Sequence, residues 1–353
     1  MSTKYTVSTP SSIIRNKMKE LNKLKEKIFR NEMITKEEVF FLVTADLSAL
    51  SKAANEIRTH FSGNDFDMCS VFSIKGGHCS ENCCFCSQSS LSKAEVTQFS
   101  LKSIEEILAD ARLRSKQGIH HYCLVSVGHH LSDNEVSKLC ETVRRIRQET
   151  KLLPCVSGGL LTLPPLTQLK EAGIVMIHNN LESSRSFFET LCSTHTYDDK
   201  LETIQNAKKA GLSICCGGLF GLGESWEDRI ELALTIRNLD MSSNDQSAPN
   251  HLSHKAGNIY SVPINLLDPV PGTPLEDAPV LTEPEVRRII AIFRFLLPKQ
   301  YIRLAAGRDY LADGGLSCFQ AGANAAITGD LLTVMGISVE KDLQTVGELG
   351  YKL

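Results

Sequence analysis

The stretch from Cys69 to Cys86 reads CSVFSIKGGHCSENCCFC and joins a short β-rich run to a group of cysteines. The run from Cys69 to Ile74 has the length and the β-branched and aromatic residues of a buried strand. Directly after it, three thiols follow in C-x3-C-x2-C spacing, at Cys79, Cys83 and Cys86. Reactive side chains at the end of a strand are typical of barrel enzymes, so this junction predicts an α/β fold whose strand ends carry the chemistry.

Similar β-rich runs recur along the rest of the chain, separated by amphipathic helical stretches. We predict further strands at Tyr122–Val127, Leu153–Val156, Ile174–His178, Leu212–Cys216, Tyr260–Leu267, Tyr301–Ala305 and Ala323–Thr328. We predict helices at Ser103–Gln117, Asn134–Glu149, Pro165–Ala172, Tyr197–Ala210, Trp226–Leu239 and Glu283–Leu297. Strands that alternate with helices in this way predict a (β/α)8 TIM barrel, with a doubly wound open sheet as the alternative.

A different pattern precedes the first strand, because residues 11–60 have helical spacing throughout. A capping box of Thr35 and Glu38 marks the start of a second helix there. We therefore expect a helical extension at residues 1–64 and a barrel domain at residues 65–353. Within the barrel, the polar stretch Ser242–Gly257 is predicted to be a surface loop.

Composition narrows the class of protein. The chain has 353 residues, 42% of them hydrophobic, and a formal net charge of −3 with scattered Lys and Arg. This pattern predicts neither a nucleic-acid surface nor a membrane patch, and no apolar run approaches the ~18 residues of a membrane helix. The N-terminal residues lack the apolar core of a secretory signal and only weakly resemble a mitochondrial presequence. We expect a cytoplasmic protein.

Twelve cysteines are many for a chain without an export signal. In a reducing compartment, closely spaced cysteines indicate metal ligands or catalytic thiols rather than disulfides. Structural zinc sites take four ligands, usually as two pairs, whereas this motif offers three thiols close together. Three thiolates on a four-iron cluster leave one iron open to a substrate. The alternatives are a zinc knuckle completed by His78, or buried cysteines with no metal; Cys84 is outside the spacing.

The cysteine motif and several later segments resemble the biotin synthase family of radical S-adenosylmethionine enzymes. The triplet with an aromatic residue before its last cysteine specifies only the superfamily. The family resemblance extends over residues 65–350 through the segments Lys75–Ser90, Asn179–Glu182, Gly217–Glu224, Ser261–Asn265, Gly272–Leu275, Tyr301–Arg308 and Ala321–Asn324.

This resemblance implies a sulfurtransferase that inserts sulfur into dethiobiotin to form biotin. It implies that Cys79, Cys83 and Cys86 are the catalytic ligands of a [4Fe–4S] cluster that binds and cleaves S-adenosylmethionine. It also implies a flavodoxin or ferredoxin-type electron donor and a homodimer. The alternatives are another radical enzyme of the group, such as a hydrogenase-cofactor maturase or a methylornithine synthase-like enzyme, or a non-catalytic Fe–S protein.

A second cluster is the feature that the resemblance adds to the residues themselves. By spacing alone, cysteines inside strands are more often small buried hydrophobes, and an interior Arg usually pairs with an acid. In the family, three strand cysteines and one arginine hold an auxiliary [2Fe–2S] cluster, and the matching positions are Cys123, Cys155, Cys215 and Arg303. Cys69 or Cys216 is an alternative ligand, so we expect an auxiliary cluster that is either [2Fe–2S] or larger.

The resemblance also assigns cofactor and substrate positions. It implies that S-adenosylmethionine contacts Phe85, Asn180, Glu182, Gly217 and Gly218, and that dethiobiotin contacts Asn180, Asn265 and Thr333. Asn180 and Glu182 are expected on one face at the end of the fourth strand, and the two glycines are expected to let the backbone approach the cofactor. The glycine run lacks the spacing of a dinucleotide fingerprint, which argues against nicotinamide binding. Val334 and His195 depart from the family pattern near the expected carboxylate site.

Overall fold

Eight parallel strands form a closed barrel in the computed structural model, which describes residues 10–241, 254–331 and 336–353, with side chains from residue 16 on. The strands pair in the order β5–β4–β3–β2–β1–β9–β8–β7, and a further pairing of β5 with β7 closes the ring. They are β1 (Asp67–Lys75), β2 (His121–Ser126), β3 (Leu153–Ser157), β4 (Met176–His178), β5 (Ser213–Cys215), β7 (Ile259–Leu266), β8 (Tyr301–Leu304) and β9 (Ala325–Ile327). The predicted TIM-type barrel is confirmed, and the open-sheet alternative is wrong because the two edge strands are hydrogen-bonded to each other.

The fifth strand of the barrel is interrupted, which the sequence pattern did not predict. After β5 the chain leaves strand geometry at Cys216 and Gly217 and resumes as the short β6 (Gly218–Phe220), which pairs with β7. A Cβ on Gly217 would lie 2.0 Å from the Pro263 carbonyl oxygen, so the chain can pass this point only with glycine. The interruption lies at the carboxyl end of the barrel.

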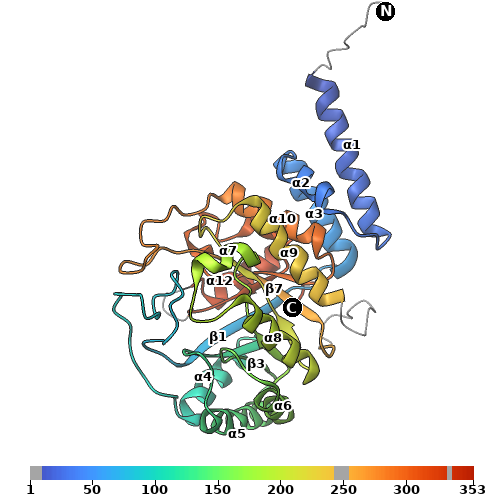
Figure 1. Cartoon of the computed structure of the whole chain (residues 1–353). Helices are drawn as coiled ribbons and strands as arrows, with labels where there is room; N and C mark the ends of the chain where they lie inside the picture. The colour runs from blue at the N-terminus through green and yellow to red at the C-terminus, as the bar shows by residue number, and fades with distance from the viewer. Residues whose placement is uncertain (1–9, 242–253, 332–335) are drawn as a thin grey trace, which may run out of the picture.

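Helices surround the strands and bury a large apolar core between the two layers (Figure 1). They are α4 (Ile104–Lys116), α5 (Asp133–Glu149), α6 (Leu163–Ala172), α7 (Arg185–Leu191), α8 (Tyr197–Lys209), α9 (Trp226–Met241), α10 (Glu283–Leu296), a 3-10 turn (Arg308–Tyr310), α11 (Leu316–Phe319) and α12 (Val339–Glu348). The predicted helices are all present, with ends shifted by a few residues. Most of the predicted loop at 242–257 lies outside the described residues.

Three helices precede the barrel: α1 (Pro10–Phe29), α2 (Lys36–Val43) and α3 (Leu47–Ser62). The predicted capping box of Thr35 and Glu38 opens α2, α3 packs against α10, and α1 packs against α3. The far end of α1 projects away from the barrel (Figure 1). The link between α3 and β1 contains the predicted boundary at residues 64 and 65, which stays a prediction.

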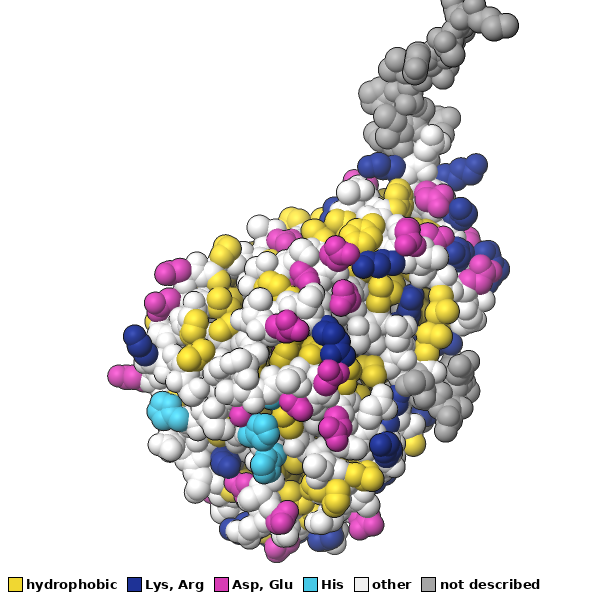
Figure 2. Space-filling model, in the orientation of Figure 1, with side chains coloured by type: hydrophobic (Ala, Val, Ile, Leu, Met, Phe, Trp, Pro, Cys, Tyr) yellow, Lys and Arg dark blue, Asp and Glu magenta, His cyan; other side chains and the backbone are white. Residues whose placement is uncertain are grey.

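The last residues of the chain are bonded to the start of the barrel. The Phe66 amide donates to the Lys352 carbonyl at 2.8 Å, and the Lys352 amide donates to the Asn64 carbonyl at 2.7 Å. Among the described residues, none of the helices combines the length and apolar character needed to span a bilayer. On the face that Figure 2 shows, acidic and basic side chains are interspersed.

Candidate cluster and cofactor site

The loop after β1 carries the cysteine triplet at the carboxyl end of the barrel. Gly76 and Phe99 bridge the two ends of this loop, with backbone hydrogen bonds of 3.2 and 3.0 Å. A Cβ on Gly76 would lie 2.4 Å from the Phe99 ring, and Gly77 has a positive φ of 125°. Glycine is therefore required at this turn, because larger residues would push the loop away from the barrel.

Backbone hydrogen bonds fix the cysteines within the loop. The Cys79 amide donates to the Gln88 carbonyl at 2.7 Å, and the Cys86 amide donates to the Cys83 carbonyl at 3.2 Å. All three thiols of the triplet are partly exposed. Burial raises the pKa of Cys83 and Cys86 above the usual thiol value. A bound cation would reverse that cost, because metal ligation needs the thiolate form.

The residues next to the triplet form two further contacts at the carboxyl end of the barrel, which we call its mouth. Phe85 and Cys84 pack on a small apolar cluster that includes Leu222 and Leu267. The Cys84 amide donates to the Leu191 carbonyl at 2.9 Å, and its side chain packs on this apolar cluster. Phe85 thus lies beside the glycine run that follows β5, where the adenine of the cofactor is expected.

Asn180 and Glu182 lie beyond β4 rather than within it, so the expected strand face is wrong. β4 ends at His178, and Glu182 has a φ of 68°, which breaks the alternation of side chains that an extended strand would impose. The Asn180 Oδ1 atom accepts from the Gly217 amide at 3.0 Å. Burial raises the pKa of Glu182. The two side chains nevertheless reach the same part of the mouth.

Gly217 and Gly218 make room for protein backbone rather than for empty space. The Cβ that is absent from Gly217 would meet Pro263, and the one absent from Gly218 would lie 2.5 Å from the Glu182 carbonyl oxygen. The physical reason for these glycines is close packing within the barrel, which differs from the expected approach to the cofactor. Their contact with S-adenosylmethionine stays a prediction.

Four cysteines meet inside the barrel in one buried group. Cys69, Cys123, Cys155 and Cys215 come from β1, β2, β3 and β5, and Tyr260 and Tyr301 pack with them. Cys123 and Cys155 are direct neighbours across the β2–β3 pair. Burial raises the pKa of all four thiols, to about 12 for Cys69 and about 11 for Cys215.

Cys216 lies on the opposite side of the barrel wall from this group. It belongs to the apolar core shared with the helices, whereas the preceding Cys215 points inward. This is the alternation expected for consecutive residues of a barrel strand. Of the two substitutes that the sequence left open, only Cys69 therefore lies beside Cys123, Cys155 and Cys215.

Arg303 lies next to the interior thiols and is held by protein groups at every nitrogen. Its Nε donates to Ser261 Oγ at 2.9 Å, its Nη1 donates to the Ala326 carbonyl at 3.0 Å, and its Nη2 pairs with the carboxylate of Asp67. Asp67 is fully buried and also contacts His121 Nδ1 at 2.9 Å. Burial opposes its ionisation, but His121 and Arg303 keep the pKa of Asp67 well below its usual range.

Sequence reasoning missed Asp67 and His178. His178 ends β4, and its Nδ1 lies 3.4 Å from Cys215 Sγ; burial lowers the pKa of this imidazole to about 4, which keeps it neutral. The only signal for Asp67 was the general rule that an interior arginine pairs with an acid. No local motif indicates which acid pairs with it.

The predicted substrate residues have different outcomes. Asn265 on β7 donates from Nδ2 to the Gly218 carbonyl at 3.0 Å, so its amide is already engaged with the β6 backbone. Thr333 and Val334 lie outside the described residues. The side chain of His195, which departs from the family pattern, is almost fully buried against Glu81, with its Nδ1 atom 2.6 Å from Glu81 Oε2.

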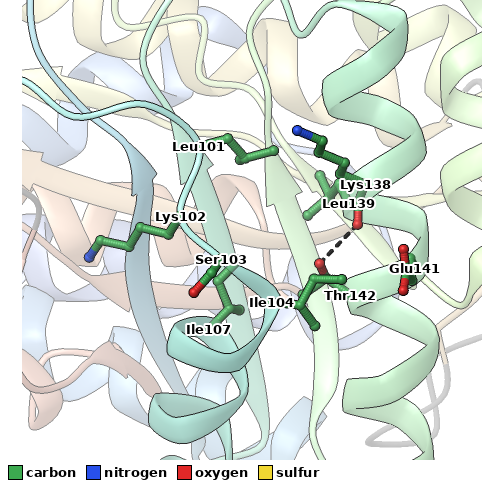
Figure 3. A pocket seen from close by; sticks show the side chains of 9 residues that line it. All are labelled: Leu101, Lys102, Ser103, Ile104, Ile107, Lys138, Leu139, Glu141 and Thr142. Carbon is green, nitrogen blue, oxygen red and sulfur yellow. Dashed lines mark hydrogen bonds between the residues drawn. The ribbon is translucent and has the colours of Figure 1, made fainter.

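A separate cavity of about 290 Å³ lies on the outside of the barrel, between the start of α4 and α5. Figure 3 shows its lining, where Thr142 Oγ1 donates to the Lys138 carbonyl at 2.9 Å. Apolar side chains such as Ile107 and Leu139 line it together with lysines. None of the predicted site residues lines this cavity, so we assign it no part in the site.

Comparisons with known proteins agree with the barrel fold and with the cysteine motif on its first loop. Residues 73–236 match the model of the radical SAM superfamily, and residues 263–352 match the biotin and thiamin synthesis associated domain. The biotin synthase of Brachyspira hyodysenteriae is 44% identical over 341 residues, which cover 97% of this chain and 97% of that protein.

Solved structures of two other enzymes have the same fold. A methylornithine synthase superposes with a TM-score of 0.74 at 20% identity, covering 93% of this chain and 96% of that one. A maturase of the [FeFe]-hydrogenase superposes with a TM-score of 0.78 at 16% identity, covering 96% of this chain and 78% of that one. At such low identity these two structures show the fold alone.

Proposed function

The chain belongs to the biotin synthase family of radical S-adenosylmethionine enzymes, and from this premise we propose that it converts dethiobiotin to biotin by inserting one sulfur atom. The observation that carries the proposal is the pairing of two thiol sets in one barrel. One set lies on the loop at the mouth, and the other is buried among the strands. Radical generation alone needs only the first set, whereas sulfur insertion needs a sulfur source close to the substrate.

The loop set fits the cluster that generates the radical. Cys79, Cys83 and Cys86 offer three thiols on one loop, and Gly76 and Gly77 let this loop pack closely against Phe99 and Gln98. A [4Fe–4S] cluster held there supplies an open iron for the amine and carboxylate of S-adenosylmethionine and the electron that yields a 5′-deoxyadenosyl radical. Phe85, Asn180 and Glu182 then hold the nucleoside part of the cofactor at the mouth.

Dethiobiotin and biotin differ by two C–H bonds replaced by two C–S bonds, so two hydrogen atoms must be removed. The barrel holds the two reacting carbons within reach of the cofactor and excludes water, which a carbon radical requires to avoid side reactions. Asn265 and Thr333 are proposed to hold the ureido ring and the carboxylate of the substrate. Each hydrogen removed takes one electron from a flavodoxin or ferredoxin-type donor by way of one cleaved cofactor.

We propose that the interior set holds the auxiliary cluster through Cys123, Cys155 and Cys215, with Cys69 as the fourth thiol and Arg303 as the buried counter-charge. Support comes from the acceptors around Arg303, since all its nitrogens already donate to Asp67, Ser261 or the β9 backbone. A guanidinium has no acceptor for a metal, whereas the Cys69 thiol is free of any covalent partner. Four thiols are the usual ligand set of a [2Fe–2S] or a [4Fe–4S] cluster.

Two other functions remain as outcomes of the test. A maturase-like or methylornithine synthase-like enzyme would use the loop set without an auxiliary sulfur source. A non-catalytic Fe–S carrier would need no substrate pocket. The interior thiols favour sulfur insertion over both. We further propose that the enzyme works as a homodimer in the cytoplasm, where reduced thiols persist.

Anaerobic reconstitution tests the function directly. We expect the full chain to take up iron and sulfide for two clusters and to form biotin, detected by mass, when dethiobiotin, S-adenosylmethionine and a strong reductant are supplied. Iron for one cluster and no biotin would refute sulfur insertion while leaving radical chemistry intact.

The ligand set of the auxiliary cluster needs a matched pair of variants. Cys69→Ser is expected to remove auxiliary iron and biotin formation, whereas Cys216→Ser is expected to leave both unchanged. These two residues differ in which side of the barrel wall they face. Equal iron content in the two variants would exclude Cys69 as a ligand.

A further inference from the structure

A third group of side chains with metal-binding chemistry lies beside the cysteine loop, and two of its three members, Cys192 and His195, have no part in the proposed reaction. Cys192 caps the end of α7, and its Sγ lies 3.7 Å from Cys83 Sγ. His195 Nδ1 lies 3.3 Å from Cys192 Sγ. The donor atoms of Cys83, Cys192 and His195 all lie within 4.8 Å of one another. Three donors thus converge on one point without any change of backbone.

These separations match those of ligands around a tetrahedral metal ion. With metal–sulfur bonds of about 2.3 Å and metal–nitrogen bonds of about 2.0 Å, a tetrahedral site places two sulfurs about 3.8 Å apart and a sulfur and a nitrogen about 3.5 Å apart. The observed distances of 3.7 and 3.3 Å lie close to both. Two thiolates and an imidazole also match the preference of zinc-type ions for sulfur and nitrogen donors.

The two segments that carry these donors are fixed to each other by Asn82. Its Oδ1 accepts from the amides of Ser193 at 2.9 Å and Thr194 at 3.2 Å, and its Nδ2 donates to Ser193 Oγ at 2.7 Å. Cys83 is the next residue in the chain, so its distance from Cys192 is set by this bonding. The side chain of His195 is 7% exposed and Cys192 is buried, so two of the three donors are shielded from water.

Charge also favours a divalent cation at this point. Two thiolates would balance the charge of one such ion. Glu81 adds a carboxylate beside the group, with Oε2 2.6 Å from His195 Nδ1 and 2.7 Å from Thr194 Oγ1. His129 contacts the other oxygen of that carboxylate at 3.0 Å. The carboxylate is thus held where it can replace its hydrogen bond to His195 by an interaction with the ion.

We propose that, in the chain without its loop cluster, Cys83, Cys192 and His195 bind one divalent zinc-type ion. The ion and the [4Fe–4S] cluster exclude each other, because both require the Cys83 thiolate. This exclusion rests on the proposed function, which assigns Cys83 to the cluster. A chain that has taken up zinc must lose it before the radical-generating cluster can form.

Cobalt(II) is the probe for this site, because a thiolate-bound tetrahedral Co²⁺ ion has charge-transfer and visible bands. The full chain, stripped of iron under reducing anaerobic conditions, is titrated with Co²⁺ and then with Zn²⁺. We expect a set of tetrahedral bands that one equivalent of Zn²⁺ abolishes. Other thiols also bind Co²⁺, so the site is identified by the difference between variants.

Cys192→Ser and His195→Gln are the informative variants, and Cys140→Ser and Cys318→Ser are their controls. The control cysteines are buried and free but lie on α5 and α11. The informative variants should bind the ion at least ~10–100-fold more weakly, since even the loss of a supporting group costs that much. Identical cobalt spectra and affinities in all five proteins would overturn the proposal. Circular dichroism verifies that each variant is folded.

The second arm measures competition with the loop cluster. Wild-type chain preloaded with one equivalent of Zn²⁺ should take up iron and sulfide at the loop more slowly than the zinc-free chain, and Cys192→Ser should show no such delay. Equal uptake with and without zinc in the wild type would overturn the exclusion. The cobalt arm needs no cluster, so a failure there leaves sulfur insertion untouched. A failure of sulfur insertion likewise leaves the cobalt result valid.

Discussion

The two thiol sets of this barrel are built in opposite ways. The loop set lies within eight residues, from Cys79 to Cys86, is partly exposed, and is held in place by backbone hydrogen bonds. The interior set comes from four strands and is buried. It lies beside the buried ion pair that Arg303 forms with Asp67. The loop suits a cluster that must admit a cofactor and electrons. The interior suits a sulfur source that must be shielded until the substrate is in place.

This contrast predicts that substitution of a loop cysteine abolishes the reaction without unfolding the chain. Cys86→Ser should reduce cleavage of S-adenosylmethionine by on the order of 10⁴-fold or more, as for the loss of one member of a catalytic unit. Formation of 5′-deoxyadenosine, measured by chromatography, reports the loss. Cys84→Ser is the matched control, because Cys84 is a neighbouring loop cysteine that faces the apolar cluster. Equal losses in both variants would show that the spacing of the triplet does not select its ligands.

A substitution beside the interior set should instead lower the free energy of unfolding. Asp67→Asn keeps the shape of the side chain but leaves the Arg303 charge unpaired, and removing one partner of a buried pair costs about 3–5 kcal/mol. Urea unfolding of the cluster-free chain measures this loss.

Asp342→Asn provides the matched control for Asp67→Asn. Asp342 forms a similarly buried pair with Arg308, away from the thiols. Both variants should lose stability, but only Asp67→Asn should also lower the iron content of the auxiliary cluster. If the two variants retained equal auxiliary iron, Asp67 would have a purely structural role.

A smaller effect should separate the loop from the interior within one protein. Gly76→Ala places a methyl group against the Phe99 ring, and overpacking of this kind costs about 1–3 kcal/mol. We expect the loop cluster to lose occupancy while the auxiliary cluster keeps its iron, as measured by iron analysis and spectroscopy. Gly347→Ala, where a Cβ meets nothing within 4 Å, should change neither. Loss of both clusters from Gly76→Ala would show that the two sets are not independent.

The smallest expected change in stability concerns the helices outside the barrel, away from both thiol sets. Asp228 accepts from Ser184 Oγ and Ser225 Oγ, each at 2.6 Å, and thereby joins the starts of α7 and α9. Burial opposes its ionisation, but these hydroxyls lower the pKa of Asp228 below the usual value. Its contribution of about 1 kcal/mol is therefore complete above about pH 4, where even the unfolded carboxyl is ionised, and is lost as the pH falls further.

Melting temperatures of Asp228→Asn and the wild type measure this contribution. They should differ at pH 7 and converge as the pH falls below about 4. A constant difference would show that the carboxylate charge is irrelevant there. Unchanged iron content in this variant marks the baseline for the other predictions.

The contrast between the sets also explains what the sequence could predict. The loop triplet is local, so spacing alone indicated a metal site. Cys123, Cys155 and Cys215 were identified as a group only through the family resemblance, because they come from three strands that are far apart in the sequence. Asp67 could not be found, since its partner Arg303 is far along the chain and no motif links them.

Backbone conformation accounts for the predictions that were wrong. Side-chain alternation placed Asn180 and Glu182 on a strand face, but β4 ends earlier and Glu182 has a positive φ. The glycines at 217 and 218 were expected to let the backbone approach the cofactor, whereas in the structure they make room for Pro263 and Glu182. The eight strands themselves were predictable because each is an apolar run between turn residues. The short β6 was not, because its run is broken by glycine.

The pairing of β1 with β9 bears on how the molecule is made. Asp67 pairs with Ala325, and Lys352 bonds to the residues just before β1, so the barrel cannot close until nearly the whole chain has left the ribosome. Contacts between segments so distant in sequence form slowly. Until then, the first strand has an open edge on the side where β9 will pair. Arg303 lies on β8, so the interior thiols gain this neighbour late, and the proposed auxiliary cluster would find a complete site only after most of the chain has been made.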